Sequence, residues 1–193
     1  QVDDHSKPIP GTEEHIPCDT LLLSVGLIPE NELSKAVGVE LSPVTNGPKV
    51  NESLETSIPG VFACGNVLHV HDLVDYVSEE AEQAGRHAAA FVAAGGGGQA
   101  VEEIPVKPGG AARYTVPVAI SPQRMEDQVV IRFRVGRNIR KGVVKVYGGG
   151  KLLYQRKRPV MAPGEMEQVV FQKEWLTGGE DVIRVVAEEE EAQ

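Results

Sequence analysis

The chain has 193 residues, which is enough for one ordinary domain or two small ones. Hydrophobic residues make up 41% and charged residues 24%, as in a soluble globular protein. No apolar run approaches the roughly 20 residues that a membrane span needs, so we expect no membrane insertion. The N-terminus lacks a signal-peptide pattern, which favours a cytoplasmic location. It begins with Gln-Val-Asp-Asp and not with Met, which we interpret as a processed or shortened chain.

The net charge of -9 is unevenly distributed along the chain. Residues 1–100 contain 4 Lys/Arg and 15 Asp/Glu, whereas residues 101–193 contain 15 and 13. This asymmetry predicts two units. The boundary is expected at Gly95–Gly98, because four consecutive glycines have no side chains to pack. We therefore predict a first domain at 1–94, a Gly/Pro-rich linker at 95–110 and a second domain at 111–193.

The first domain is expected to be α/β. The apolar run 20–25 and the segment 61–64 each predict a short strand buried on both faces, as in a parallel sheet. Residues 31–37 predict a helical turn. Residues 73–94 predict a helix that is acidic at its start and rich in alanine at its end, with Asp72 as the N-cap.

The second domain is expected to be all β. Ile131 and Phe133 alternate with Arg132 and Arg134, and this period of two is typical of a strand with one buried face. Turn residues separate the alternating segments. We predict a small antiparallel β-sandwich of immunoglobulin-like size, with strands near 113–120, 128–135, 142–148, 151–158, 166–173 and 181–187.

Three segments of the first domain resemble the pyridine nucleotide-disulfide oxidoreductase superfamily. Residues 18–31 (CDTLLLSVGLIPEN) resemble its strand that ends in Gly before a Pro-containing turn, and residues 56–67 (TSIPGVFACGNV) resemble its second FAD motif. Residues 73–92, with Gly85 and Ala88-Ala89, resemble the helix that follows. The resemblance implies that residues 1–94 are the C-terminal part of a Rossmann-like FAD-binding domain. The expected fold class is this α/β remnant followed by the β-sandwich.

The resemblance also implies where a flavin would bind. In the family an acidic residue follows the Gly at the strand end and accepts hydrogen bonds from the ribityl-phosphate part of FAD; here Asn66 follows Gly65. Asn keeps an acceptor oxygen, gains two N–H donors and carries no charge. The N–H groups at the helix start would face the pyrimidine edge of the flavin. We predict that FAD is bound by Gly65, Asn66, Val67, Val74 and Asp75; an ordinary turn and capped helix are the alternative. No catalytic residue is predicted.

Motifs that the family carries upstream are absent from the sequence. It contains no Gly-x-Gly-x-x-Gly for a dinucleotide and no C-x-x-C redox pair. We therefore expect a C-terminal fragment of an FAD-dependent NAD(P)H oxidoreductase that is inactive alone. It would need the missing N-terminal FAD/NAD(P) portion as its partner. Strands built to be buried on both sides would otherwise need another cover, which predicts self-association.

His69, His71 and Asp72 lie close enough in sequence to be read as metal ligands. No further ligand is evident from the sequence, so we predict no metal. A histidine near the flavin could instead donate a proton. The cysteines Cys18 and Cys64 have neither redox nor zinc spacing and are expected to be reduced thiols.

The segment 132–158 contains ten Lys/Arg and no Asp/Glu, which is compatible with nucleic-acid binding. The basic residues alternate with apolar ones, as on the solvent face of a strand, and the pI of about 5.1 argues against nucleic acid. A basic face that docks an acidic domain, such as the first half, fits better. The alternative function is therefore an interaction module at 111–193 that docks a partner subunit. This segment resembles C-terminal extensions of flavin oxidoreductases found beside anaerobic glycerol-3-phosphate dehydrogenase-type enzymes, which implies a partner oxidoreductase subunit.

Overall fold

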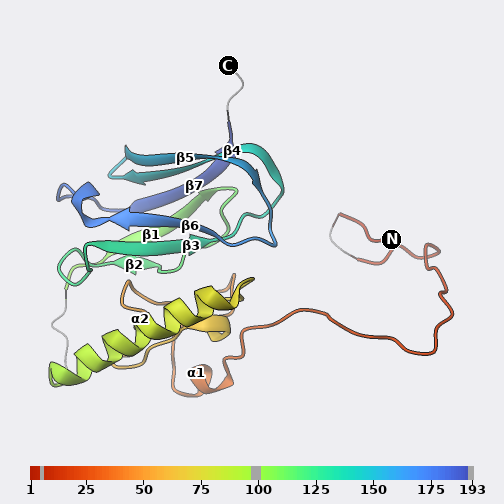
Figure 1. Cartoon of the computed structure of the whole chain (residues 1–193), viewed down its shortest axis with the longest axis horizontal. Coiled ribbons are helices and arrows are strands. Elements are labelled where there is room, and N and C mark those ends of the chain that lie inside the picture. Colours follow the sequence, from red (N-terminus) through yellow and green to blue (C-terminus); the bar gives the residue numbers. More distant parts are fainter. Residues whose placement is uncertain (5–6, 97–100, 191–193) are drawn as a thin grey trace.

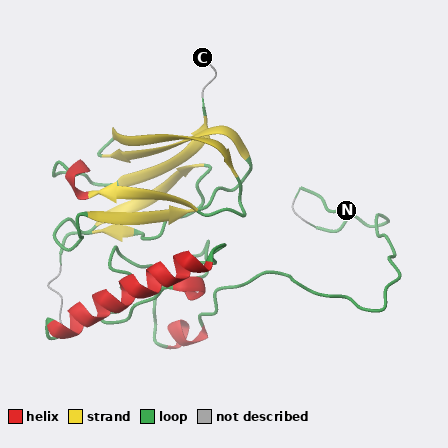
Figure 2. Cartoon of the chain, in the orientation of Figure 1, coloured by secondary structure: helices red, strands yellow, loops and turns green. Residues whose placement is uncertain are grey.

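The computed structural model describes residues 1–4, 7–96 and 101–190 (Figure 1). The fold is mixed α/β, with the helices in the first half and the sheets in the second (Figure 2). None of the helices described is long and apolar enough to cross a membrane. The helical elements are α1 (Glu32–Ala36), the 3-10 turn η1 (Gly65–Val67), α2 (Val74–Ala93) and the 3-10 turn η2 (Lys173–Trp175).

Both helices of the first half form where the sequence predicts them. α1 occupies most of the predicted turn at 31–37, and α2 matches the predicted helix to within one residue at each end. The prediction of Asp72 as N-cap is wrong. Leu73 is the N-cap, with extended backbone and no side-chain cap. Asp72 points its carboxylate elsewhere, because it accepts the N–H of Met166 from the second half of the chain at 3.1 Å.

The two predicted parallel strands of the first half are not formed. The run 20–25 is extended coil that leaves the body of the protein (Figure 1), with Leu22 90% and Val25 89% exposed. In 61–64, only Phe62 pairs, in an isolated bridge to Glu55. A strand with two apolar faces is stable only between neighbouring strands with both faces covered. The described residues of the first half supply no such neighbours, so the sequence pattern is present without the sheet.

The second half consists of two sheets (Figure 2). A five-stranded sheet has the order β2-β1-β7-β4-β5, and a two-stranded sheet pairs β3 with β6. Five predicted strands are confirmed with small shifts at their ends, but the one at 113–120 is reduced to β2. The strands are β1 (Ile104–Gly110), β2 (Ala119–Ile120), β3 (Gln128–Phe133), β4 (Ile139–Gly148), β5 (Lys151–Met161), β6 (Glu167–Gln172) and β7 (Ile183–Glu189).

Strand β1 lies inside the predicted linker 95–110, and it pairs in parallel with β7. The prediction of a linker is therefore wrong for 104–110, while residues 97–100 lie outside the described part. The two prolines of β1 misled the sequence interpretation. Val106 donates its N–H to Val118 at 2.8 Å, so the ring nitrogen of Pro108 faces the same side, where pairing with β2 has ended. Pro105 faces the other side, before pairing with β7 begins.

The inner faces of both sheets share one apolar core. Residues of β3 and β6 meet residues of β4 and β7 in a single cluster, and the central side chains are completely shielded from solvent. Alternate residues of these strands point into this core, as the period of two predicts. The largest fully buried members are Ile120, Ile131, Phe133, Phe171, Ile139, Met161 and Ile183.

The first half packs against the sheets through a second, smaller core. Val50, Leu54, Leu68 and Ala84 form it together with Val116, which comes from the segment before β2. The backbone continues this contact, because the N–H of Val118 donates to the carbonyl of Val50 at 2.9 Å. The two halves of the described chain therefore share a core and pack directly against each other.

The exposed apolar run at 20–28 generates the first prediction. Leu22 and Val25 are almost fully exposed, and such patches favour association. We expect the chain to self-associate at micromolar concentration, and the double variant Leu22→Asp/Val25→Asp to shift sedimentation velocity profiles toward the monomer. Leu33→Asp, at an 85% exposed position on α1 outside this run, is the matched control and should leave association unchanged. A wild-type chain that sediments only as monomer contradicts the prediction.

Candidate functional site

The turn η1 (Gly65–Val67) is held tightly against α2. Gly65 has a φ of +67°, which favours glycine. A Cβ at this position would lie 3.2 Å from Cγ1 of Val77 in α2. The backbone N–H of Gly65 donates to Oε2 of Glu80, also in α2, at 2.9 Å. The turn therefore brings bare backbone next to the first turns of the helix.

The side chain of Asn66 is oriented by the loop that follows it. Its Oδ1 accepts the backbone N–H of His71 at 3.0 Å. Its Nδ2 has no hydrogen-bond partner among the described residues. Oδ1 of Asn66, which we expected to accept a hydrogen bond from a ribityl hydroxyl, is thus already bonded to the loop. The group that Asn66 can offer to a ligand is its N–H₂ donor.

The N-terminus of α2 is open. No side chain caps it, so its first backbone N–H groups lack the usual protein acceptor. Val67 is 41%, Leu73 50% and Val74 74% exposed. Asp75 is also exposed and places a carboxylate in the first turn. The five residues predicted for flavin binding thus come together as a glycine turn, an amide donor and a helix start with apolar side chains around it.

Behind the turn lies a buried polar cluster that centres on Glu80, whose side chain is 1% exposed. Each carboxylate oxygen of Glu80 accepts two hydrogen bonds. Oε1 accepts from Nε2 of His69 at 2.9 Å and from Nη1 of Arg132 at 3.1 Å. Oε2 accepts from the N–H of Gly65 at 2.9 Å and from Nε2 of His71 at 3.0 Å. Both histidines are buried, and Arg132 is only 4% exposed.

This cluster determines the charge states of its members. Burial, together with the neighbouring His71 and Arg132, lowers the pKa of His69 below 6.5 despite the opposing hydrogen bond and charge of Glu80. Burial by itself raises the pKa of Glu80, but the hydrogen bonds from His69 and His71 lower it more, to well below its usual range. At neutral pH we therefore expect an ionised Glu80 that is balanced by the Arg132 guanidinium, with His69 neutral.

The sequence suggested His69, His71 and Asp72 as candidate metal ligands and no further one, whereas the structure places Glu80 beside the two histidines. One ligand atom from each of the three residues lies within 4.8 Å of the others. The geometry nevertheless favours a hydrogen-bonded network, because four N–H donors occupy Glu80 and Arg132 brings a positive charge. Metal-bound histidines usually donate their second ring N–H to an acceptor, whereas Nδ1 of His69 and of His71 has no partner among the described residues. The absence of a metal remains a prediction.

Arg132 of β3 and Arg134, just after this strand, contribute to the contact between the two halves. The interpretation of Arg132 as part of a solvent-facing strand surface is wrong, because it is buried and bonds both Glu80 and Glu79. Arg134 donates to the carbonyl of Val70 at 3.0 Å and pairs with Asp72 at 3.4 Å. These two arginines therefore dock the second half on the acidic first half.

Glu80 and the histidines were missed as a unit by the sequence interpretation, although a signal exists. Val77, Glu80 and Ala84 are spaced as residues on one face of a helix, and that face carries the buried Ala84. A carboxylate on the apolar face of a helix requires buried hydrogen-bond partners. The distant residue that supplies the charge, Arg132, has no such signal, because its place depends on how β3 packs.

Comparison with known proteins places the candidate site within a segment that matches a protein family. Residues 1–94 match the family described as pyridine nucleotide-disulphide oxidoreductase. The chain is similar to the glutamate synthase [NADH] of Schizosaccharomyces pombe, with 31% identity over 81 residues, which is 42% of this chain and 4% of that protein. It is 38% identical to the ferredoxin–NADP reductase of Picrophilus torridus over 52 residues, or 27% of this chain and 16% of that protein.

The putidaredoxin reductase of Pseudomonas putida is 38% identical over 56 residues, which is 29% of this chain and 13% of that protein. No solved structure matches the chain. The chain thus spans only a small part of the length of these relatives. The segment that matches the family includes the TSIPGVFACGNV motif and the glycine turn beside α2. Residues 1–94 are thus similar to the pyridine nucleotide-disulphide oxidoreductase family.

Removing the charge of Glu80 tests the buried cluster. In Glu80→Gln, Arg132 stays buried and loses its buried carboxylate, keeping only the exposed Glu79 as a partner. Breaking a buried pair costs about 3–5 kcal/mol. Glu79→Gln is the matched control on the same helix: Glu79 pairs with the same arginine, but its side chain is 61% exposed, so the cost should be at most about 1 kcal/mol. Urea unfolding measures both. Equal losses for the two variants would show that the cluster does not hold the fold together.

The pH dependence of stability tests the state of His69. Because its folded pKa lies below 6.5, the unfolded chain binds this proton at a higher pH than the folded chain does. The free energy of unfolding should therefore fall as the pH decreases below about 6.5, by at most about 1.4 kcal/mol per pH unit from this group. Urea unfolding between about pH 7.5 and about pH 5.5 measures it. His69→Gln should flatten the slope, whereas His15→Gln at an exposed position should not.

Proposed function

We propose that η1 and the start of α2 form one wall of the FAD site of an FAD-dependent NAD(P)H oxidoreductase. The observation that carries the proposal is the uncapped N-terminus of α2 beside a glycine turn, within a segment that matches the family. Helix N-termini favour the negative charge that develops at N1 and O2 when a flavin is reduced. The exposed side chains of Val67, Leu73 and Val74 would contact the apolar ring.

The donor of Asn66 defines a role for this residue. Since Oδ1 is bonded to the loop, Nδ2 would donate to an oxygen of the ribityl-phosphate chain. This differs from the acidic residue of the family, which accepts. The contact adds no negative charge near the phosphates, and it fixes a position along the cofactor, not the chemistry at the ring.

The chain supplies only part of such a site. The printed sequence contains no Gly-x-Gly-x-x-Gly, so the pyrophosphate of FAD and the nicotinamide nucleotide would be bound by an N-terminal portion of a longer protein. That portion would also cover the exposed run at 20–28. We propose that the chain alone does not catalyse electron transfer from NAD(P)H, and that the whole enzyme passes electrons through FAD to an acceptor such as a partner oxidoreductase subunit.

The alternative of a partner-docking module at 111–193 has less support. Three arginines of this half, Arg124, Arg132 and Arg134, pair with carboxylates of the first half. The basic surface that suggested a docking role is therefore used in part within the chain.

Flavin binding tests the proposal. The chain alone should bind FAD weakly or not at all, as followed by the quenching of flavin fluorescence. In the longer protein encoded by the same reading frame, Asn66→Leu should weaken FAD binding by about tenfold, because one hydrogen bond to a charged oxygen is lost. Glu82→Gln, on an exposed position of α2, is the control. Stoichiometric flavin retained by the chain alone, or an unchanged affinity in Asn66→Leu, would overturn it.

A further inference from the structure

The uncapped helix α2 is preceded by a residue that could cap it. Asp72 lies directly before the N-cap Leu73, and aspartate is among the residues that cap helices best. If Leu73 joined the helix, the Asp72 carboxylate would accept from Val74 and Asp75, because a capping side chain accepts the N–H of the residue two or three positions further on. These are the same N–H groups that we expect to face the flavin.

In the structure the second half of the chain holds this carboxylate instead. Oδ2 of Asp72 accepts the backbone N–H of Met166 at 3.1 Å, and Oδ1 pairs with Nη2 of Arg134 at 3.4 Å. Met166 lies directly before β6 and Arg134 directly after β3, so both contacts come from the ends of the two-stranded sheet. No side chain caps α2 as a result.

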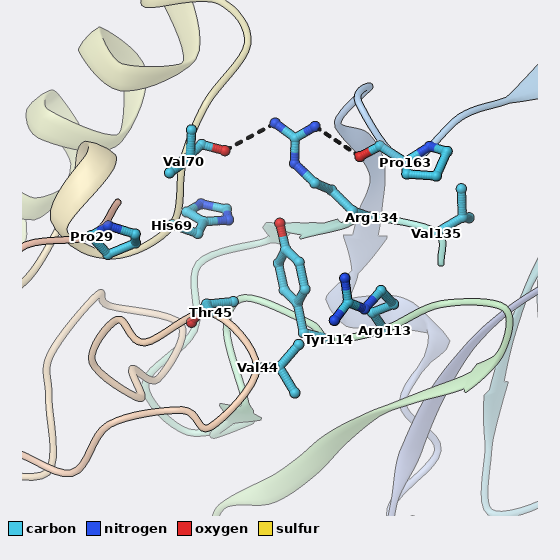
Figure 3. A pocket seen from close by; sticks show the side chains of 10 residues that line it. All are labelled: Pro29, Val44, Thr45, His69, Val70, Arg113, Tyr114, Arg134, Val135 and Pro163. Atoms are coloured by element: carbon cyan, nitrogen blue, oxygen red, sulfur yellow. Dashed lines mark hydrogen bonds between the residues drawn. The ribbon is translucent and has the colours of Figure 1, made fainter. Parts of the chain in front are cut away.

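Arg134 is itself fixed by two backbone carbonyls. Its Nη2 donates to the carbonyl of Val70 at 3.0 Å, and its Nη1 donates to that of Pro163 at 3.2 Å. Figure 3 shows the guanidinium between these two carbonyls, one from the loop before α2 and the other from the loop between β5 and β6. The side chain of Arg134 is only 16% exposed. A largely buried guanidinium with three acceptors around it keeps its position, and with it the position of Asp72.

The charge of Asp72 would oppose a flavin at the start of the helix. The positive end of the helix dipole favours the negative charge that develops on a reduced flavin. A carboxylate bonded there would occupy the same N–H groups and repel that charge. Asp75 already places one carboxylate in the first turn, and Asp72 would add a second. Arg134 prevents this, because it binds the Asp72 carboxylate and supplies the opposite charge.

We propose that Arg134 is a positioning residue, which holds Asp72 away from the N-terminus of α2 and so keeps the N–H groups of this helix free for the pyrimidine edge of a flavin. Without the pair, Asp72 would cap α2 and close this wall to the ring. The second half thereby controls a wall that the first half forms. The part that concerns the flavin rests on the function proposed above, whereas the hold of Arg134 on Asp72 does not.

Amide hydrogen exchange of the ¹⁵N-labelled chain, without FAD, tests the hold on Asp72. In Arg134→Gln the exchange of the Val74 and Asp75 amides should slow by about fivefold, the factor that one capping hydrogen bond supplies. A loosened structure would speed exchange, so slowing distinguishes a new cap from a general loss of packing. Arg134→Gln/Asp72→Ala should restore the wild-type rates, because no carboxylate is left to form the cap. Unchanged or faster exchange in Arg134→Gln, or slowing that persists in the double variant, would overturn the proposal.

Arg124→Gln is the matched control for these rates. Arg124 also pairs across the two halves, with Glu52, but it has no contact with Asp72. Its loss should leave the exchange of the Val74 amide within about twofold of the wild type. Equal slowing in Arg124→Gln and Arg134→Gln would contradict a specific role of Arg134.

FAD affinity in the longer protein encoded by the same reading frame tests the consequence for the flavin. Arg134→Gln should weaken FAD binding by about tenfold, and adding Asp72→Ala should return it to within about threefold of the wild type. Asp72→Ala alone should bind FAD within about twofold of the wild type, because Asp72 contributes no contact to the ring. A loss in Asp72→Ala as large as that in Arg134→Gln would overturn the proposal. Exchange rates that change as expected while all variants bind FAD equally would support the hold on Asp72 and overturn the flavin wall.

Discussion

The buried carboxylate of Glu80 is the constraint on which the arrangement of the site depends. Taking an ion out of water is costly unless charge and hydrogen bonds replace the solvent. Here four N–H donors do so, and they come from three separate parts of the chain: Gly65 of the turn, His69 and His71 of the loop, and Arg132 of β3. The ion cannot be satisfied unless turn, loop and sheet are all in place. Its burial therefore couples the geometry of the turn to the docking of the sheets on the first half.

This coupling explains why the first half keeps a defined shape although it forms no sheet of its own. Its apolar core is small, and it is completed by Val116 from the other half. Glu52 adds a second polar anchor, because it accepts the N–H of Ser121 at 3.0 Å and pairs with Arg124. Three arginines of the second half, Arg124, Arg132 and Arg134, thus pair with carboxylates of the first half. The charge asymmetry that suggested two units also supplies ion pairs between them.

The sequence predicts those elements whose formation depends on nearby residues, and it does not predict those that depend on distant packing. The helix 73–94 and the alternating strands depend on periodicity within a few residues, and they form where expected. The run 20–25 has an equally clear strand pattern but no sheet to join, because burial on both faces depends on neighbours that no local pattern supplies. Strand β1 was missed for the opposite reason: Pro105 and Pro108 are local signals against a strand, and only the register shows that neither interrupts a ladder. In the candidate site the sequence predicts the glycine turn. It does not predict the pairing of Glu80 with Arg132, because these residues are 52 positions apart.

A neutral residue at position 66 is compatible with the buried charge of Glu80. Glu80 already places a carboxylate directly behind the turn, bonded to the N–H of Gly65. A second carboxylate at position 66 would face this charge across the turn, and like charges at short range disfavour ionisation. It would also have to accept the N–H of His71, as Oδ1 of Asn66 does, leaving one oxygen for a ligand. An amide satisfies the loop with its oxygen and keeps a donor outward. The departure from the acidic residue of the family is thus linked to the Glu80–histidine cluster behind the turn, and position 66 and position 80 should be considered together.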